Sequence, residues 1–74
     1  MSHYQLNVRG LLCPLPVIKV QGKVKELMPG DTLEIICTDP GALQDVPAWC
    51  RIHGHEVITT QQQQLDIVLT IRVR

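Results

Sequence analysis

The sequence predicts an α+β two-layer sandwich, in which two helices cover one face of a four-stranded sheet. Short segments with apolar residues at alternate positions indicate strands, and apolar residues at helical spacing indicate helices between the first three of them. The predicted order is β-α-β-α-β-β. Right-handed crossovers between parallel strands place both helices on one face when the strands are added in one direction. At 74 residues, residues 1–74 are expected to form a single domain.

The first strand and the first helix are predicted on either side of Gly10. Tyr4, Leu6 and Val8 alternate with polar residues, which is the period of a strand with one buried face. The helix that follows should end before the turn signal Pro29-Gly30. Its apolar stripe consists of Val17, Val20, Val24 and Leu27.

The second strand is predicted over residues 31–38, and a second helix follows it. Asp39-Pro40 is a favourable start, because aspartate caps helices and proline fits the first helical position. Gly54 is a favourable C-terminal cap. Pro47 lacks a backbone N–H and should kink the helix or restart it near Asp45. The apolar residues predicted on this helix are Leu43, Val46, Trp49 or Cys50, and Ile52.

The last two strands are predicted to form a hairpin. Val57 and Ile58 indicate the third strand, and the run Gln61 to Gln64 is interpreted as a polar turn. The fourth strand alternates through Leu65, Ile67, Leu69, Ile71 and Val73. The face of the sheet away from the helices is then mostly polar, with scattered aliphatic residues. These residues are Ile36, Ile58 and Val68. One interpretation is that they form a docking site, and the other is that they are ordinary scattered surface aliphatics.

Charge and composition argue against several functions. The seven basic and seven acidic side chains leave no net charge to attract nucleic acid, and only two aromatic residues are available for base stacking. The apolar stretch 11–20 is too short to span a bilayer, and it does not have the pattern of a secretory signal. We therefore expect a cytoplasmic protein without direct contact to nucleic acid or membrane. Three widely spaced cysteines fit reduced thiols.

The segment GLLCPLP at residues 10–16 carries the candidate chemistry. Cys13 precedes a proline and should be extended, while Pro14 and Pro16 fit the first turn of the helix. A cysteine at the positive end of a helix has a lowered pKa and can act as a nucleophile. The leucines of this turn equally permit a buried, inert cysteine, and the residues alone leave both interpretations open.

Other cysteine chemistries fit less well. A redox pair would need a cysteine at position 16, where proline stands. Cys50, His53 and His55 have partial zinc-ligand spacing but no second ligand pair, so we expect neither a metal nor a cofactor. Cys37 belongs to the apolar side of its strand. One reactive cysteine, without a resolving cysteine or an adjacent acid or base, suits a carrier of a sulfur-bound group.

A set of motifs gives a resemblance to a known family. The runs LNVRGLLCPLPVIK, PGDTLEI, TDP, DVPAWC and GHE, in this order, resemble the TusA (SirA-like) sulfur-carrier family. The resemblance implies a mixed sheet of order 1-2-4-3 with the fourth strand antiparallel, and it favours one kinked second helix. It also implies a sulfurtransferase-type carrier whose Cys13 accepts persulfide sulfur from a cysteine desulfurase or rhodanese-like donor. The resemblance further implies that Cys13 passes this sulfur to an acceptor protein, in a relay that feeds tRNA thiolation, molybdenum cofactor supply or sulfur oxidation.

Within this resemblance, Gly10, Pro14 and Pro16 support the cysteine motif. Arg9, Lys19 and Lys23 are candidates for a basic rim that docks a partner, although solvated side chains explain them as well. Asn7 stands where the family often has aspartate. The alternative function is a non-catalytic regulatory module that binds protein or RNA on its open sheet face.

Overall fold

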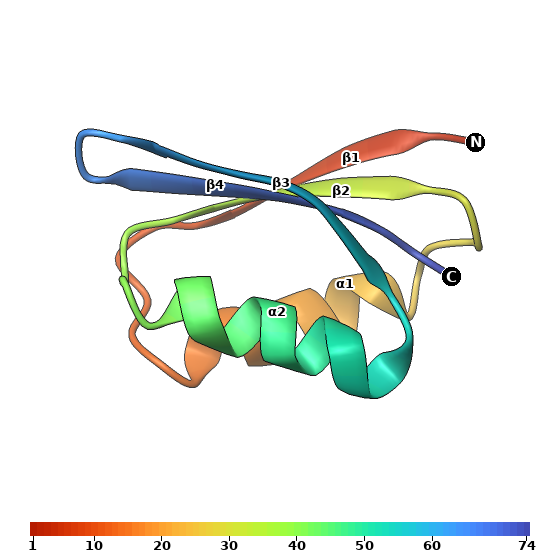
Figure 1. Cartoon of the computed structure of the whole chain (residues 1–74), viewed down its shortest axis with the longest axis horizontal. Helices are drawn as coiled ribbons and strands as arrows, with labels where there is room; N and C mark the ends of the chain where they lie inside the picture. The colour runs from red at the N-terminus through yellow and green to blue at the C-terminus, as the bar shows by residue number, and fades with distance from the viewer.

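Two layers make up the protein, whose computed structural model describes all 74 residues (Figure 1). Both helices lie on the same side of one sheet, as predicted. The elements in chain order are β1 (His3–Val8), α1 (Leu15–Val24), β2 (Thr32–Cys37), α2 (Ala42–His53), β3 (Glu56–Gln63) and β4 (Asp66–Arg72). Neither helix has the length and apolar character needed to cross a membrane.

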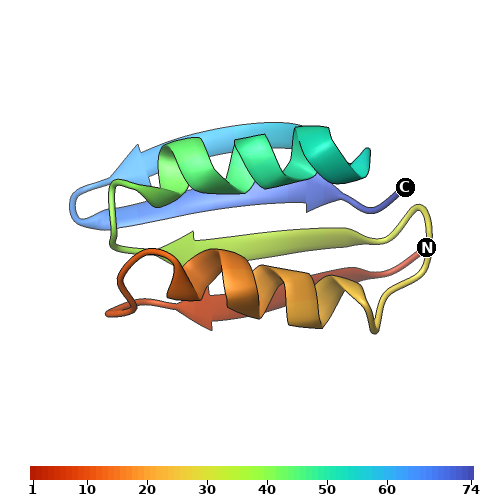
Figure 2. The same cartoon turned by 90° about the horizontal axis from the view of Figure 1, so that it is seen from below.

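The sheet has the order β1-β2-β4-β3, which confirms the fold class and the topology implied by the family resemblance. β1 and β2 are parallel neighbours, and β4 runs antiparallel to both β2 and β3. Figure 2 shows α1 lying along β1 and β2, and α2 lying along β3 and β4. Both helices begin at the same end of the molecule, because each follows a strand that ends there.

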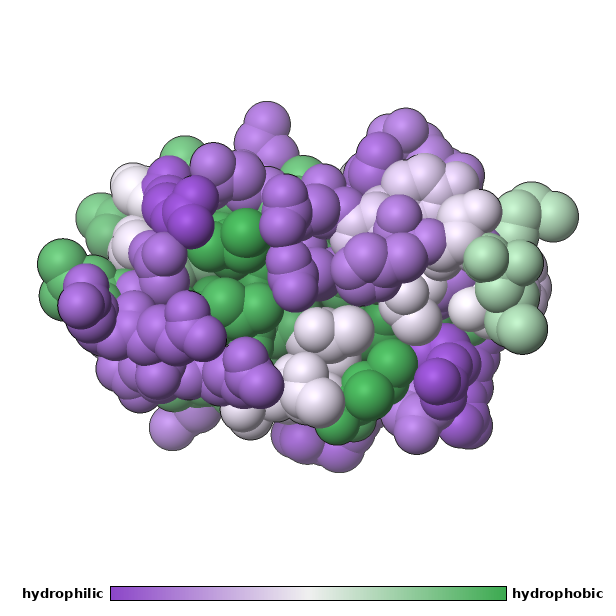
Figure 3. Space-filling model, turned by 90° about the horizontal axis from the view of Figure 1, so that it is seen from above, coloured by the Kyte–Doolittle hydropathy of each residue, from purple (hydrophilic) through white to green (hydrophobic).

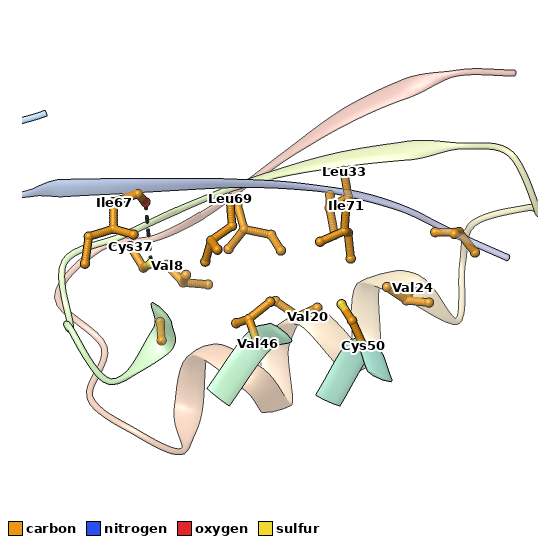
Figure 4. Close-up of a cluster of buried hydrophobic side chains, with 13 residues drawn as sticks. Val8, Val20, Val24, Leu33, Cys37, Val46, Cys50, Ile67, Leu69 and Ile71 are labelled. Carbon is orange, nitrogen blue, oxygen red and sulfur yellow. Dashed lines mark hydrogen bonds between the residues drawn. The ribbon is translucent and has the colours of Figure 1, made fainter. Parts of the chain in front are cut away.

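The core lies between the sheet and the helices, and aliphatic residues dominate it (Figure 4). The sheet contributes residues at alternate positions, so every inward side chain of β4 is buried. The core residues are Val8, Val20, Val24, Leu33, Ile35, Cys37, Ala42, Val46, Cys50, Ile67, Leu69, Ile71 and Val73.

The second helix is a single element that accommodates Pro47 in its interior. Its buried stripe is Ala42, Val46 and Cys50, at a spacing of four residues. Of the apolar residues predicted on this helix, Leu43 and Ile52 do not belong to the core: Leu43 is 36% exposed and Ile52 is 78% exposed. Both are rotated around the helix away from that stripe.

The two ends of α2 differ in how far they follow the prediction. Gly54 forms the predicted C-terminal cap: it has a φ of 81°, and its N–H donates to the carbonyl of Cys50. At the other end the cap residue is Gly41. The side chain of Asp39 instead caps the preceding turn, where its Oδ1 accepts the N–H of Gly41 at 3.2 Å.

The glutamine run is mainly strand, which corrects the prediction of a polar turn at residues 61–64. Gln61, Gln62 and Gln63 pair with β4, and the reversal occurs at Gln64-Leu65. Gln64 has a φ of 57°, a conformation uncommon for a residue with a side chain. The strand is possible because β3 is at the sheet edge, where backbone pairing with one neighbour does not require buried side chains.

The face of the sheet away from the helices is polar with apolar patches between the polar side chains (Figure 3). Arg72 and Arg74 both contact Glu56 Oε1 at 2.8 Å, and Gln5 donates to Glu34 at 2.6 Å. Among the predicted aliphatic residues of this face, Ile36 is only 9% exposed, whereas Ile58 is 38% exposed. Of these two residues, Ile58 therefore contributes more apolar surface to this face than Ile36 does.

A buried carboxylate joins the start of the chain to the turn before β2. Asp31 is 6% exposed, and its two oxygens accept the N–H groups of Ser2 and Met28, each at 2.9 Å. These backbone hydrogen bonds, from Met28 first and Ser2 second, hold the pKa of Asp31 below its usual value of 3.8.

We expect Asp31→Asn to lower the stability of the fold at neutral pH and to reduce the loss of stability that acid causes. A lowered pKa in the folded state means that the ionised carboxylate stabilises the fold above the unfolded pKa. This contribution is lost as the pH falls through the lowered folded pKa. Thermal melts of both proteins should therefore differ most at neutral pH and converge in acid. A gap that stays constant down to the acid limit would contradict this account.

Candidate functional site

The candidate site is built from the loops that follow β1 and β2. Because these strands are parallel neighbours, their carboxyl ends meet at one edge of the sheet. Gly10 turns the first loop with a φ of 80° and donates its N–H to Thr38 Oγ1 at 2.9 Å. Cys13 N–H donates to Asp39 Oδ2 at 2.7 Å. Two hydrogen bonds thus tie the cysteine loop to the segment after β2.

The motif prolines lie at the start of α1, close to the predicted position. The helix begins at Leu15 with Pro14 as the cap residue, and Pro16 is buried in its first turn. The Cys13-Pro14 peptide bond is cis. Cys13 precedes the cap residue, so it is near the helix N-terminus without itself capping the helix.

A carboxylate of α2 contacts the sulfur of Cys13. The Sγ–H donates to Asp45 Oδ2 across 2.7 Å, in the first turn of α2. Cys13 therefore has Asp39 at its backbone and Asp45 at its side chain. The sequence predicts no acid or base adjacent to this cysteine, and the contact with Asp45 corrects that prediction.

These contacts reverse the expected direction of the pKa shift. The hydrogen bond to Asp45, the loss of some hydration at the protein surface, and the negative charges of Asp45 and Asp39 all raise the pKa of Cys13. The helix N-terminus favours the thiolate, but two carboxylates at closer range outweigh it. In the isolated protein the sulfur is therefore held mainly as a neutral thiol at neutral pH.

Cys13 is exposed, whereas Cys37 and Cys50 are buried. Of the two interpretations left open by the sequence, the structure therefore favours an accessible cysteine. Cys37 lies in the core as predicted, with its Sγ 3.5 Å from the carbonyl oxygen of Ile67. Burial raises the pKa of Cys50 to about 11. Both buried thiols are thus poor nucleophiles at neutral pH.

The residues considered for a zinc site are arranged around an aromatic ring instead. His53 and His55 lie on Trp49, with ring centroids 4.8 and 5.2 Å from it. His55 Nδ1 also accepts the backbone N–H of Arg74 at 3.1 Å. The side chain of Cys50 lies in the core (Figure 4), whereas the two imidazoles lie against Trp49.

The structure does not bring the three basic candidates together at Cys13. Arg9 forms a bidentate salt bridge with Asp66: its Nε donates to Oδ1 at 3.0 Å and its Nη2 donates to Oδ2 at 2.9 Å. Lys23 lies 3.9 Å from Glu26 and above the ring of Tyr4. Lys19 is exposed and forms no ion pair. The charged groups that contact the cysteine are the two aspartates, so a docking role for the basic residues remains a prediction.

The surface beside the cysteine is apolar and open. Leu12 is 70% exposed, Leu15 is 45% exposed and Ile18 is 55% exposed. No pocket that could enclose a small substrate opens on the protein. An exposed thiol with apolar neighbours is suited to contact with another protein surface.

Asp39 and Asp45 are the site residues that sequence reasoning missed. They are 26 and 32 residues from Cys13 along the chain. A signal for Asp39 was available, because it directly follows a strand predicted to run parallel to β1. Asp45 gave no such signal, since its contact depends on the position of α2.

Comparison with known proteins finds a family that matches nearly the whole chain. A family model described as sulfurtransferase TusA matches residues 4–73. The sulfur carrier protein TusA of Pseudomonas aeruginosa is 41% identical over 67 residues, which covers 90% of this chain and 85% of that protein. The protein of the same name from Pseudomonas syringae pv. tomato is 37% identical over 67 residues, covering 90% and 80%.

A solved structure shares the fold. The crystal structure of a SirA-like protein from Desulfitobacterium hafniense matches with a TM-score of 0.82. The match covers 93% of this chain and 95% of that chain, at 20% sequence identity. At this identity the likeness supports the architecture of two helices on a mixed sheet.

Proposed function

The chain belongs to the sulfurtransferase TusA family, and we propose from this premise that it is a sulfur carrier whose Cys13 holds sulfur as a persulfide. The observation that carries the proposal is the exposure of Cys13, in contrast to the burial of Cys37 and Cys50. Only this sulfur can meet a sulfur atom of another molecule without unfolding. The relatives' name, sulfur carrier protein, supports the same role.

Sulfur uptake needs only exchange at sulfur. The Cys13 thiolate attacks the outer sulfur of a donor persulfide, so a bond forms between Cys13 Sγ and that sulfur. The sulfur–sulfur bond of the donor breaks, and the donor thiolate leaves and takes up a proton. Delivery repeats the exchange with an acceptor thiolate as the attacking group and Cys13 as the leaving group. No external oxidant, reductant or cofactor takes part in either step.

The partners in this proposal are proteins. A cysteine desulfurase or a rhodanese-like protein would supply the sulfur, and an acceptor protein would receive it in the cytoplasm. The open surface at Leu12, Leu15 and Ile18 supports protein partners, because it offers contact area without a pocket. Uptake then depends on an encounter that brings the two sulfur atoms together.

Mass spectrometry after incubation with a cysteine desulfurase and cysteine tests the proposal. The intact protein should gain the mass of one sulfur atom, and a reducing thiol should remove it. Peptide mapping should place the added sulfur on Cys13. An unchanged mass, or a persulfide mapped to Cys37 or Cys50, would count against the proposal.

A further inference from the structure

The carboxylate of Asp45 contacts the sulfur of Cys13. We propose that Asp45 is a positioning residue that holds the sulfur of the unloaded carrier as a hydrogen-bonded, neutral thiol. This inference rests on the proposed function, since it describes the resting state of the same sulfur. Reaction then requires that the sulfur leave the carboxylate, which an encounter with a partner surface would bring about.

The geometry fixes the two groups against each other. Asp45 Oδ2 lies 2.7 Å from Cys13 Sγ. Asp45 is in the first turn of α2, and its backbone N–H donates to the carbonyl of Gly41 at 2.9 Å. On the other side, Asp39 Oδ2 accepts the backbone N–H of Cys13. The backbones of both residues are therefore held by hydrogen bonds on either side of the contact.

The charged groups around the loop do not offset this carboxylate. Asp39 adds a second negative charge, from the segment before α2. The cation on the cysteine loop, Arg9, is bound to Asp66 of β4. Two further cations are on α1: Lys19 forms no ion pair, and Lys23 lies 3.9 Å from Glu26, which follows the helix. Thus no cation contacts the sulfur, and the charge that acts on it most closely is that of Asp45.

This arrangement separates accessibility from reactivity. An exposed thiolate would react with any electrophile or oxidant in solution. A thiol hydrogen-bonded to a carboxylate is equally exposed but much less nucleophilic, because the thiolate is the reacting species. Asp45 therefore protects the empty carrier between transfers, without the shelter of a pocket.

The pH dependence of Cys13 alkylation tests this role in the full chain, with no sulfur donor present. In Asp45→Asn, the rate profile for iodoacetamide should move to lower pH, and the rate at pH 7 should rise roughly fivefold, because loss of the carboxylate increases the thiolate fraction. Asp45→Glu should restore the profile toward that of the natural protein. Alkylation of the buried Cys37 and Cys50 should be negligible, as Cys13→Ser would verify.

Glu26→Gln is the matched control, since it removes one carboxylate that does not contact Cys13. Its profile should overlie that of the natural protein. If Asp45→Asn retains its fold but also keeps that profile, the proposed role of Asp45 is wrong. Asp45→Ser provides the same test if the asparagine variant does not fold. These assays use no persulfide. The proposed role of Asp45 can therefore fail while Cys13 still takes up sulfur, and sulfur uptake can fail while the alkylation profiles behave as expected.

Discussion

Replacing Cys13 by serine should abolish sulfur uptake while leaving the fold intact. A serine hydroxyl is not ionised at neutral pH and cannot form the sulfur–sulfur bond that stores the transferred atom. Its oxygen can still donate a hydrogen bond to Asp45, so the loop contact that Cys13 makes at 2.7 Å has a replacement. The intact mass after incubation with the desulfurase should remain that of the untreated variant.

Cys50→Ala is the control for this result. Cys50 is 1% exposed and lies in the core, so its removal should leave sulfur uptake at Cys13 unchanged. A thermal melt should show that Cys13→Ser unfolds at the temperature of the natural protein. Sulfur gained by Cys13→Ser would mean that another thiol is the carrier, and it would refute the assignment to Cys13.

Leu69→Ala should remove a large part of the free energy of unfolding. Leu69 is fully buried in the core. It is on β4, an interior strand of the sheet that pairs with both β2 and β3. A buried leucine replaced by alanine costs about 2–5 kcal/mol, and a domain of this size has a total stability of only about 5–10 kcal/mol. Urea denaturation followed by circular dichroism should show a strongly lowered midpoint.

The same substitution at the hairpin provides the comparison. Leu65 is 83% exposed, so Leu65→Ala should change the free energy of unfolding by less than about 0.5 kcal/mol. Similar losses at both positions would contradict the description of the core. A lowered urea midpoint with an unchanged denaturant slope in Leu69→Ala would show that stability alone was affected.

The sheet could be predicted because apolar residues stand at every second position of β1, β2 and β4. The inward residues of β4, Ile67, Leu69 and Ile71, are large aliphatics at every second position, and all of them are buried. The parallel pairing of β1 and β2 followed from the helix between them. The helical connections also placed α1 and α2 on one face.

Errors arose where the identity of a residue was a poor guide to its position. Ile52 is apolar but lies about 200° around α2 from Cys50, so it cannot share its buried side. Small Ala42 is in the core, whereas the larger Leu43 beside it is 36% exposed. Gln61 to Gln63 look like turn residues, yet pairing with β4 supplies the backbone hydrogen bonds of a strand.

The position of Cys13 could be predicted, but its electrostatic state could not. The prolines and the end of β1 located it next to α1, where the helix alone would lower its pKa. The actual shift depends on side chains that only the folded chain brings within hydrogen-bond distance. The 2.7 Å contact between Cys13 Sγ and Asp45 Oδ2 is set by the conformation of the cysteine loop and the position of α2, and no spacing in the sequence encodes it.

The ring cluster on α2 gives the protein a built-in optical reporter. Trp49 is the only tryptophan of the chain, and the imidazoles of His53 and His55 lie within 5.2 Å of its ring centre. Unfolding would separate the indole from His55 at the start of β3 and expose it to water. Its fluorescence can therefore follow the junction of α2 and β3 in every variant described above, without an attached dye that would compete for Cys13.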